Sequence, residues 1–158
     1  MLNGLTHWSN KKESAVRDID NADRWLKSGE AINWVPQKIS TAIYWAIEGW
    51  LNQCEYDPDF GNGWYSMYHQ FRKLAPEKLH QEASYILSKN TFLEIELLGD
   101  PSGLEDTTGE WNLDSWKMKM DDVLLKARTF INSVEKDLLG RIRFPALARC
   151  PETQCSND

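Results

Sequence analysis

The stretch WKMKMDDVLLKARTFINSVEKDL, residues 116–138, determines the expected fold. Its apolar residues recur every three or four positions, which is the spacing of one face of an α-helix. They are Trp116, Met120, Val123, Leu124, Ala127, Phe130, Ile131, Val134 and Leu138. The pattern predicts an amphipathic helix from about Asn112 or Leu113 to Leu139, ended by Gly140, with its apolar face buried against other helices.

The same spacing predicts two helices in the first third of the chain. Residues 14–28 form an amphipathic pattern that should stop at Gly29, because glycine readily adopts the left-handed conformation of a helix C-cap. Pro36 fits the first turn of a second helix, which runs to about Cys54. The segment AIYWAIEGWL, residues 42–51, is apolar nearly all round, as is typical of the buried central member of a bundle.

Residues 64–74 predict a short third helix that Pro76 interrupts, and residues 79–97 predict a fourth that ends at Gly99. The two could also form one kinked element. Turn residues from Gly99 to Glu110 predict a long acidic loop. Sustained period-two alternation is absent, so the sequence predicts an all-α, antiparallel, up-and-down bundle of four to five helices. It would occupy residues 1–140 as one domain, followed by a weakly structured C-terminal tail over residues 141–158.

Composition narrows the classes of function. A length of 158 residues suits a single domain, and eight tryptophans predict an aromatic-rich core or binding surface. The formal net charge of -6 disfavours unspecific binding to nucleic-acid phosphates. The N-terminus does not have the charge and apolar pattern of a signal peptide, and no apolar run reaches membrane-spanning length, so we expect a cytoplasmic protein with no membrane contact.

No cofactor or metal is expected. The three cysteines, Cys54, Cys150 and Cys155, fit neither a disulfide framework nor a structural zinc site, although a bridge between the last two remains open. One ExxH pair, Glu77 with His80, falls short of the two pairs that a diiron bundle uses. Nucleotide-binding loops and the common nucleophile motifs are absent from the sequence.

Two constellations could carry chemistry. Glu48 is the only charge in the apolar segment 42–51, so it either faces a ligand or is paired with a neighbouring side chain. His69 and Arg72 share a helical face, and His80 follows on the next helix. A histidine and an arginine could divide RNA cleavage between proton transfer and stabilisation of negative charge, whereas the alternative places them on ordinary solvated helix faces.

Three stretches resemble the HEPN family, which comprises small helical-bundle proteins of prokaryotic toxin–antitoxin pairs, defence systems and nucleotidyltransferase partners. They are AIYWAIEGWL at 42–51, HQFRKL at 69–74 and LKARTFI at 125–131. Ribonuclease members of the family carry an arginine, four to six residues and a histidine, whereas seven residues separate Arg72 from His80 here. Gly49 stands where a lysine often follows the glutamate of the second helix. The resemblance therefore implies a fold and a cellular setting more than a reaction.

The leading hypothesis is a HEPN-like interaction protein of a toxin–antitoxin or defence-type system, which binds a protein partner or a second copy and lacks strong catalysis. Trp8, Trp34 and Trp111 lie outside the helical stripes and could form its aromatic binding surface or close the ends of the bundle. One alternative is a metal-independent ribonuclease that acts on RNA through His69, Arg72 and His80. A second is an acidic inhibitor or immunity-type protein whose loop presents four carboxylates to a basic partner. These are Asp100, Glu105, Asp106 and Glu110.

Overall fold

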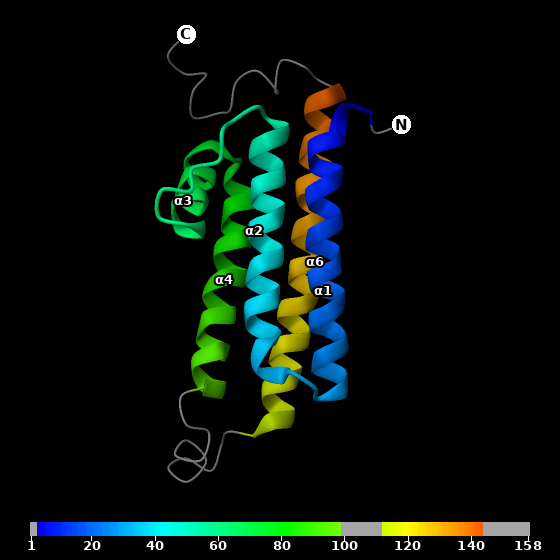
Figure 1. Ribbon diagram of the computed structural model, residues 1–158, viewed down its shortest axis with the longest axis vertical. Coiled ribbons are helices and arrows are strands. Elements are labelled where there is room, and N and C mark those ends of the chain that lie inside the picture. The colour runs from blue at the N-terminus through cyan, green and yellow to red at the C-terminus, as the bar shows by residue number, and fades with distance from the viewer. Residues whose placement is uncertain (1–2, 99–111, 144–158) are drawn as a thin grey trace.

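The computed structural model describes residues 3–98 and 112–143, and the regular structure within these ranges is entirely helical. Five α-helices pack together (Figure 1), which confirms the all-α prediction. They are α1 (Thr6–Ser28), α2 (Val35–Gln53), α3 (Trp64–Leu74), α4 (Glu77–Leu98) and α6 (Leu113–Arg143). Two short 3-10 helices, η1 (Asn3–Leu5) and η2 (Ile32–Trp34), precede α1 and α2.

Helix α2 occupies the centre of the bundle. It contacts α1, α3, α4 and α6, which explains why its sequence is apolar nearly all round. Helix α6 contacts α1, α2 and α4, and α1 and α4 lie on opposite sides of the α2–α6 pair (Figure 1). The short α3 packs beside α2 and α4 at one end of the bundle. The side of α4 and α6 that faces away from α2 is therefore left uncovered by the other described helices.

The predicted helix ends are partly right. Gly29 caps α1 in the left-handed conformation, with φ of 81°, and its N–H donates to the Trp25 carbonyl at 2.9 Å. Ala75 is extended, with φ of -81° and ψ of 156°, because the residue before Pro76 is kept out of the helical region. Residues 64–74 and the following helix are therefore two separate elements and not one kinked helix.

Two helix boundaries differ from the prediction. Helix α1 begins at Thr6 and not near residue 14, since the fully buried Trp8 anchors its first turns to the core. Gly140 does not end α6, which continues to Arg143. Arg141, 9% exposed, donates from Nε to Asp137 at 2.8 Å and lies 5.3 Å from the centre of the Trp50 ring, so the additional turn is held by contacts on both sides.

The predicted core stripes are buried. In α6, each of the nine apolar residues from Trp116 to Leu138 is at most 3% exposed. The tryptophans supply much of the core, and their indole N–H groups are satisfied at its edges. Trp8 donates to Glu135 at 2.9 Å, Trp45 to Asp18 at 3.0 Å, Trp50 to Asp137 at 2.8 Å and Trp116 to the Leu93 carbonyl at 2.8 Å. Large rings can therefore be buried without leaving an unsatisfied donor.

Candidate functional site

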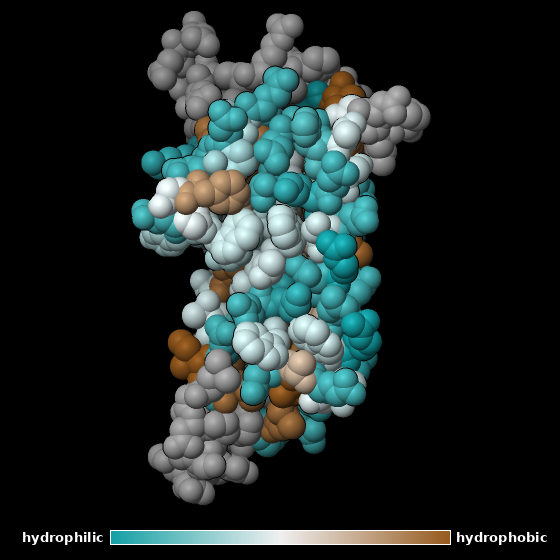
Figure 2. All heavy atoms as spheres, viewed as in Figure 1, coloured by the Kyte–Doolittle hydropathy of each residue, from teal (hydrophilic) through white to brown (hydrophobic). Residues whose placement is uncertain are grey.

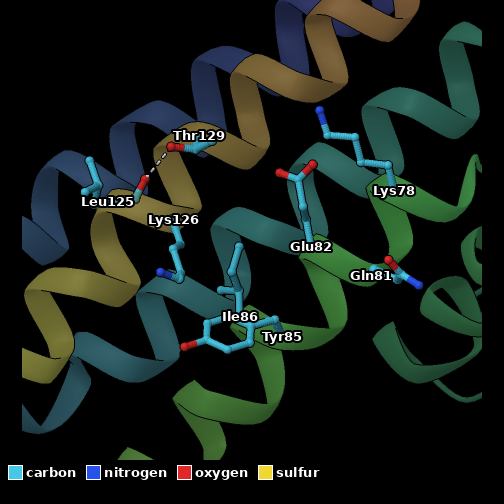
Figure 3. A pocket seen from close by; sticks show the side chains of 8 residues that line it. All are labelled: Lys78, Gln81, Glu82, Tyr85, Ile86, Leu125, Lys126 and Thr129. Carbon is cyan, nitrogen blue, oxygen red and sulfur yellow. Dashed lines mark hydrogen bonds between the residues drawn. The ribbon is translucent and has the colours of Figure 1, made fainter.

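A groove of about 520 Å³ lies between α4 and α6 on the uncovered side of the pair (Figure 3). Lys126 extends from α6 toward the ring of Tyr85 on α4, and the carboxylate of Glu82 points into the space between the helices. Apolar side chains from both helices contribute to its walls. The residues that line it are Lys78, Gln81, Glu82, Tyr85, Ile86, Leu125, Lys126 and Thr129.

The charged groups of the groove are unequally paired. Lys126 Nζ lies 3.2 Å from a carboxylate oxygen of Asp122 and 5.4 Å from the centre of the Tyr85 ring. Glu82 Oε2 accepts a hydrogen bond from Ser133 Oγ at 3.2 Å. Glu82 Oε1, in contrast, is buried and has no hydrogen-bond partner within residues 3–98 and 112–143. A buried carboxylate oxygen without a donor is costly.

Four large apolar side chains are exposed on the two helices that form the groove. Tyr85 and Phe92 on α4 are 47% and 58% exposed, and Met118 and Leu125 on α6 are 73% and 63% exposed. The members of each pair are seven residues apart, which is close to two helical turns, so each pair lies on one side of its helix. Tyr85 and Leu125 both line the groove, so the two pairs share one surface. We call these four residues the α4–α6 outer face.

The outer face was not predicted from the sequence. The predicted buried face of α6 followed the apolar stripe that includes Leu124, and Met118 and Leu125 fall outside that stripe. The available signal was a second apolar line with a spacing of seven on a helix that already had a complete buried face. An amphipathic helix needs only one apolar face for its own fold, so a second one indicates a further contact.

Glu48 is paired and does not face a cavity. Its Oε2 lies 2.9 Å from Lys11 Nζ across the contact between α2 and α1, and its side chain is 12% exposed. The Lys11 ammonium also lies 4.9 Å from the centre of the Trp45 ring. Of the two readings of Glu48, the geometry therefore favours a partnered structural carboxylate, with a lysine as its partner.

The three tryptophans outside the stripes have different surroundings. Trp8 is fully buried, so its assignment to an exposed binding surface is wrong. Trp34 is 59% exposed and lines a cavity of about 410 Å³ with Trp25, Gln37, Lys38 and Thr41. Trp34 therefore remains a candidate contact residue, whereas Trp111 lies outside the described residues.

The histidines and the arginine of the ribonuclease hypothesis lie on α3 and α4. His69 Nε2 is 2.9 Å from the Tyr65 hydroxyl, and the Arg72 guanidinium carbon is 5.8 Å from the centre of the Tyr68 ring. A cavity of about 300 Å³ beside His69 is lined also by Asp59, Asn62, Tyr65, Ser66, Gln70 and Lys73. Neither Arg72 nor His80 lines that cavity, so the three proposed catalytic groups do not converge on it.

Several predicted features lie outside the described residues. These are the acidic-loop residues Asp100, Glu105, Asp106 and Glu110 and the pair Cys150 and Cys155. Within the described ranges, no three or more His, Cys, Asp or Glu side chains are grouped so that they could hold a metal ion. None of the helices in these ranges combines the length and the apolar character needed to cross a membrane.

Comparison with known proteins gives no relative. No protein-family model matches the sequence, and neither a curated protein nor a solved structure matches the chain.

Proposed function

We propose that this protein acts by associating with another protein through the α4–α6 outer face, and not by catalysis. The observation that carries the proposal is the exposure of Tyr85, Phe92, Met118 and Leu125 on α4 and α6, where Tyr85 and Leu125 line one groove. Aromatic residues and methionine are enriched in protein interfaces. Contiguous exposed apolar surface is uncommon on a protein that stays monomeric, because it gains free energy when it leaves water.

The cellular setting in this proposal comes from the resemblance to HEPN proteins. The proposed setting is a toxin–antitoxin or defence-type system. The proposed topology is an up-and-down, HEPN-like bundle. The opposite directions of α1 and α2, and of α4 and α6, support that topology (Figure 1). RNA cleavage by His69, Arg72 and His80 stays a separate prediction that no contact among the described residues favours.

Site-specific photocrosslinking tests the proposal. A photoreactive phenylalanine analogue is placed at position 92 and, in a matched control, at position 17, where Arg17 lies on the solvent side of α1. The variants are irradiated in the cells that produce the protein. The analogue at position 92 should give a discrete crosslinked adduct, whatever the crosslinked partner is, and the analogue at position 17 should give none.

A second substitution makes the test specific. Leu125→Lys, added to the position-92 variant, should abolish the adduct because it puts a charge on the apolar surface. Equal adducts from both positions, or an adduct at position 92 that survives Leu125→Lys, would refute association through the outer face.

A further inference from the structure

The α4–α6 outer face has an internal symmetry that specifies its partner. Tyr85 on α4 and Leu125 on α6 both line the groove, so they lie at about the same height along the pair. On α4, Lys78 lies seven residues before Tyr85 and Phe92 seven residues after it. On α6, Asp114 lies eleven residues before Leu125 and Lys136 eleven residues after it. All four flanking residues are exposed.

We infer that the partner is a second copy of this chain, bound outer face to outer face with its helices antiparallel. This inference rests on the proposed function and names the partner of the same surface. A two-fold axis through Tyr85 and Leu125, perpendicular to the helices, lays α4 on the partner's α4 and α6 on the partner's α6. A two-fold interface is self-complementary, because each residue meets the residue at the mirrored position of the other copy.

The mirrored positions are complementary in charge. The axis brings Asp114 opposite the partner's Lys136, at equal distances from Leu125. It also brings Phe92 opposite the partner's Lys78, where a cation can rest on the aromatic face. A parallel arrangement would instead bring Lys78 and Lys136 of the two copies together, because the Ser133–Glu82 hydrogen bond places both lysines at the same end of the α4–α6 pair.

The antiparallel arrangement also brings a cation near the Glu82 carboxylate. Glu82 lies three residues before Tyr85, and Lys89 lies four residues after it on the same, α6-facing side of α4. Mirroring about Tyr85 therefore brings the partner's Lys89 within about one residue of Glu82 along the helix. Its ammonium would then lie near the Glu82 carboxylate, whose negative charge it would stabilise.

The size of the face is adequate for a dimer. A helical span of 22 residues, from position 114 to position 136, is about 33 Å long, and two adjacent helices are about 20 Å wide. The flat area is roughly 650 Å² per copy, and the solvent-accessible area of a corrugated surface is larger. A standard stable interface buries about 800 Å² per partner, so the outer face suffices without a contribution from other elements.

The mass of the purified full-length chain in solution tests the inference. Sedimentation equilibrium between about 1 and 200 µM should give a dimer for the unmodified chain. Leu125→Lys should weaken dimerisation by roughly a hundredfold, because two ammonium groups would then meet on the axis. The matched control Phe60→Lys changes another exposed apolar side chain, 49% exposed and placed before α3, and should leave dimerisation unchanged. Helical content from circular dichroism verifies that both variants fold.

Charge reversal tests the antiparallel orientation. Asp114→Lys and Lys136→Asp should each weaken dimerisation, by roughly tenfold, and the double variant should regain the original affinity. A double variant no better than the single ones would overturn the antiparallel arrangement. A chain that stays monomeric up to the highest concentration would overturn self-association, as would a dimer that Leu125→Lys leaves intact. If the monomeric chain still gives a Leu125-dependent adduct at position 92 in cells, the partner is a different protein and the proposed function stands.

Discussion

Substituting alanine at two helical glycines should change stability in opposite directions. A Cβ atom added to Gly49 in α2 would lie 2.8 Å from both Lys11 Cβ and Trp8 Cε3, whereas a Cβ at Gly140 in α6 would meet nothing within 4 Å. Both glycines are in helices and neither has a left-handed φ. The gain in helix propensity is therefore the same for both, and only the packing differs.

The magnitudes follow from these two effects. Replacing a helical glycine with alanine stabilises the helix by about 1 kcal/mol. At Gly49 this gain is opposed by overpacking, which costs about 1–3 kcal/mol, and the fully buried Trp8 ring has no free space into which it could shift. We expect Gly140→Ala to raise the free energy of unfolding by about 1 kcal/mol and Gly49→Ala to lower it by up to about 2 kcal/mol.

Urea unfolding followed by circular dichroism at a helical wavelength measures both changes. The midpoint should move down for Gly49→Ala and up for Gly140→Ala, with an unchanged slope in each case. A Gly49→Ala variant as stable as Gly140→Ala would refute the close approach of α1 and α2 at this position. The HEPN proteins that the chain resembles often have a lysine at the position of Gly49. Close packing of α1 against α2 would explain why this chain has glycine there, and such a result would remove that explanation.

Three further predictions concern the edges of the core. Burial alone would raise the pKa of Glu135, but hydrogen bonds from Lys12 and Trp8 outweigh it and hold this pKa below its usual value. The stability that the ionised Glu135 contributes should therefore be complete above the ordinary glutamate pKa and be lost as pH falls through the lowered pKa of the folded state. Glu135→Gln should flatten this dependence in urea midpoints measured from about pH 7 to about pH 3. Trp8→Phe removes one of these donors and part of a buried ring, so urea unfolding should show a loss of about 2–3 kcal/mol, whereas the exposed Trp34→Phe should change stability by less than about 0.5 kcal/mol. Burial raises the pKa of the Cys54 thiol to about 12. Alkylation of Cys54 near pH 8, followed by site-resolved mass spectrometry, should therefore be much slower in the folded chain than in urea. Equal rates would contradict the burial of this thiol.

The helices could be predicted from the sequence because their burial is encoded by local spacing. The bounds expected for residues 64–74 match α3, since Pro76 and the preceding glycine-rich turn restrict the backbone itself. The extent of α1 could not be predicted in the same way. Residues 6–13 are mostly polar, and the turn that contains Trp8 is held by a partner 127 residues away, Glu135 on α6. Only the tertiary contact makes that segment helical.

The candidate site was harder to predict than the fold because contacts between helices decide it. Glu48 has the same sequence signature whether it faces a ligand or a lysine, and the identity of its partner, Lys11, depends on how α1 and α2 align. The proposed catalytic set depends on contacts between elements in the same way. Spacing placed His69 and Arg72 on one helix, but it could not show that neither Arg72 nor His80 lines the cavity beside His69.

Helix α6 carries two lines of residues with a spacing of seven, and the contrast between them gives the strongest reason to expect association. The line that faces α1 ends in charged groups. Arg128 is 2.9 Å from Asp20, and Glu135 is 2.9 Å from Lys12. Hydrophilic residues likewise cover much of the α1 side of the view in Figure 2. The line that faces away from the bundle carries Met118 and Leu125, which are 73% and 63% exposed. The fold does not need these two side chains to be apolar, because α6 already buries nine others, so their apolar character is best explained by a surface that covers them.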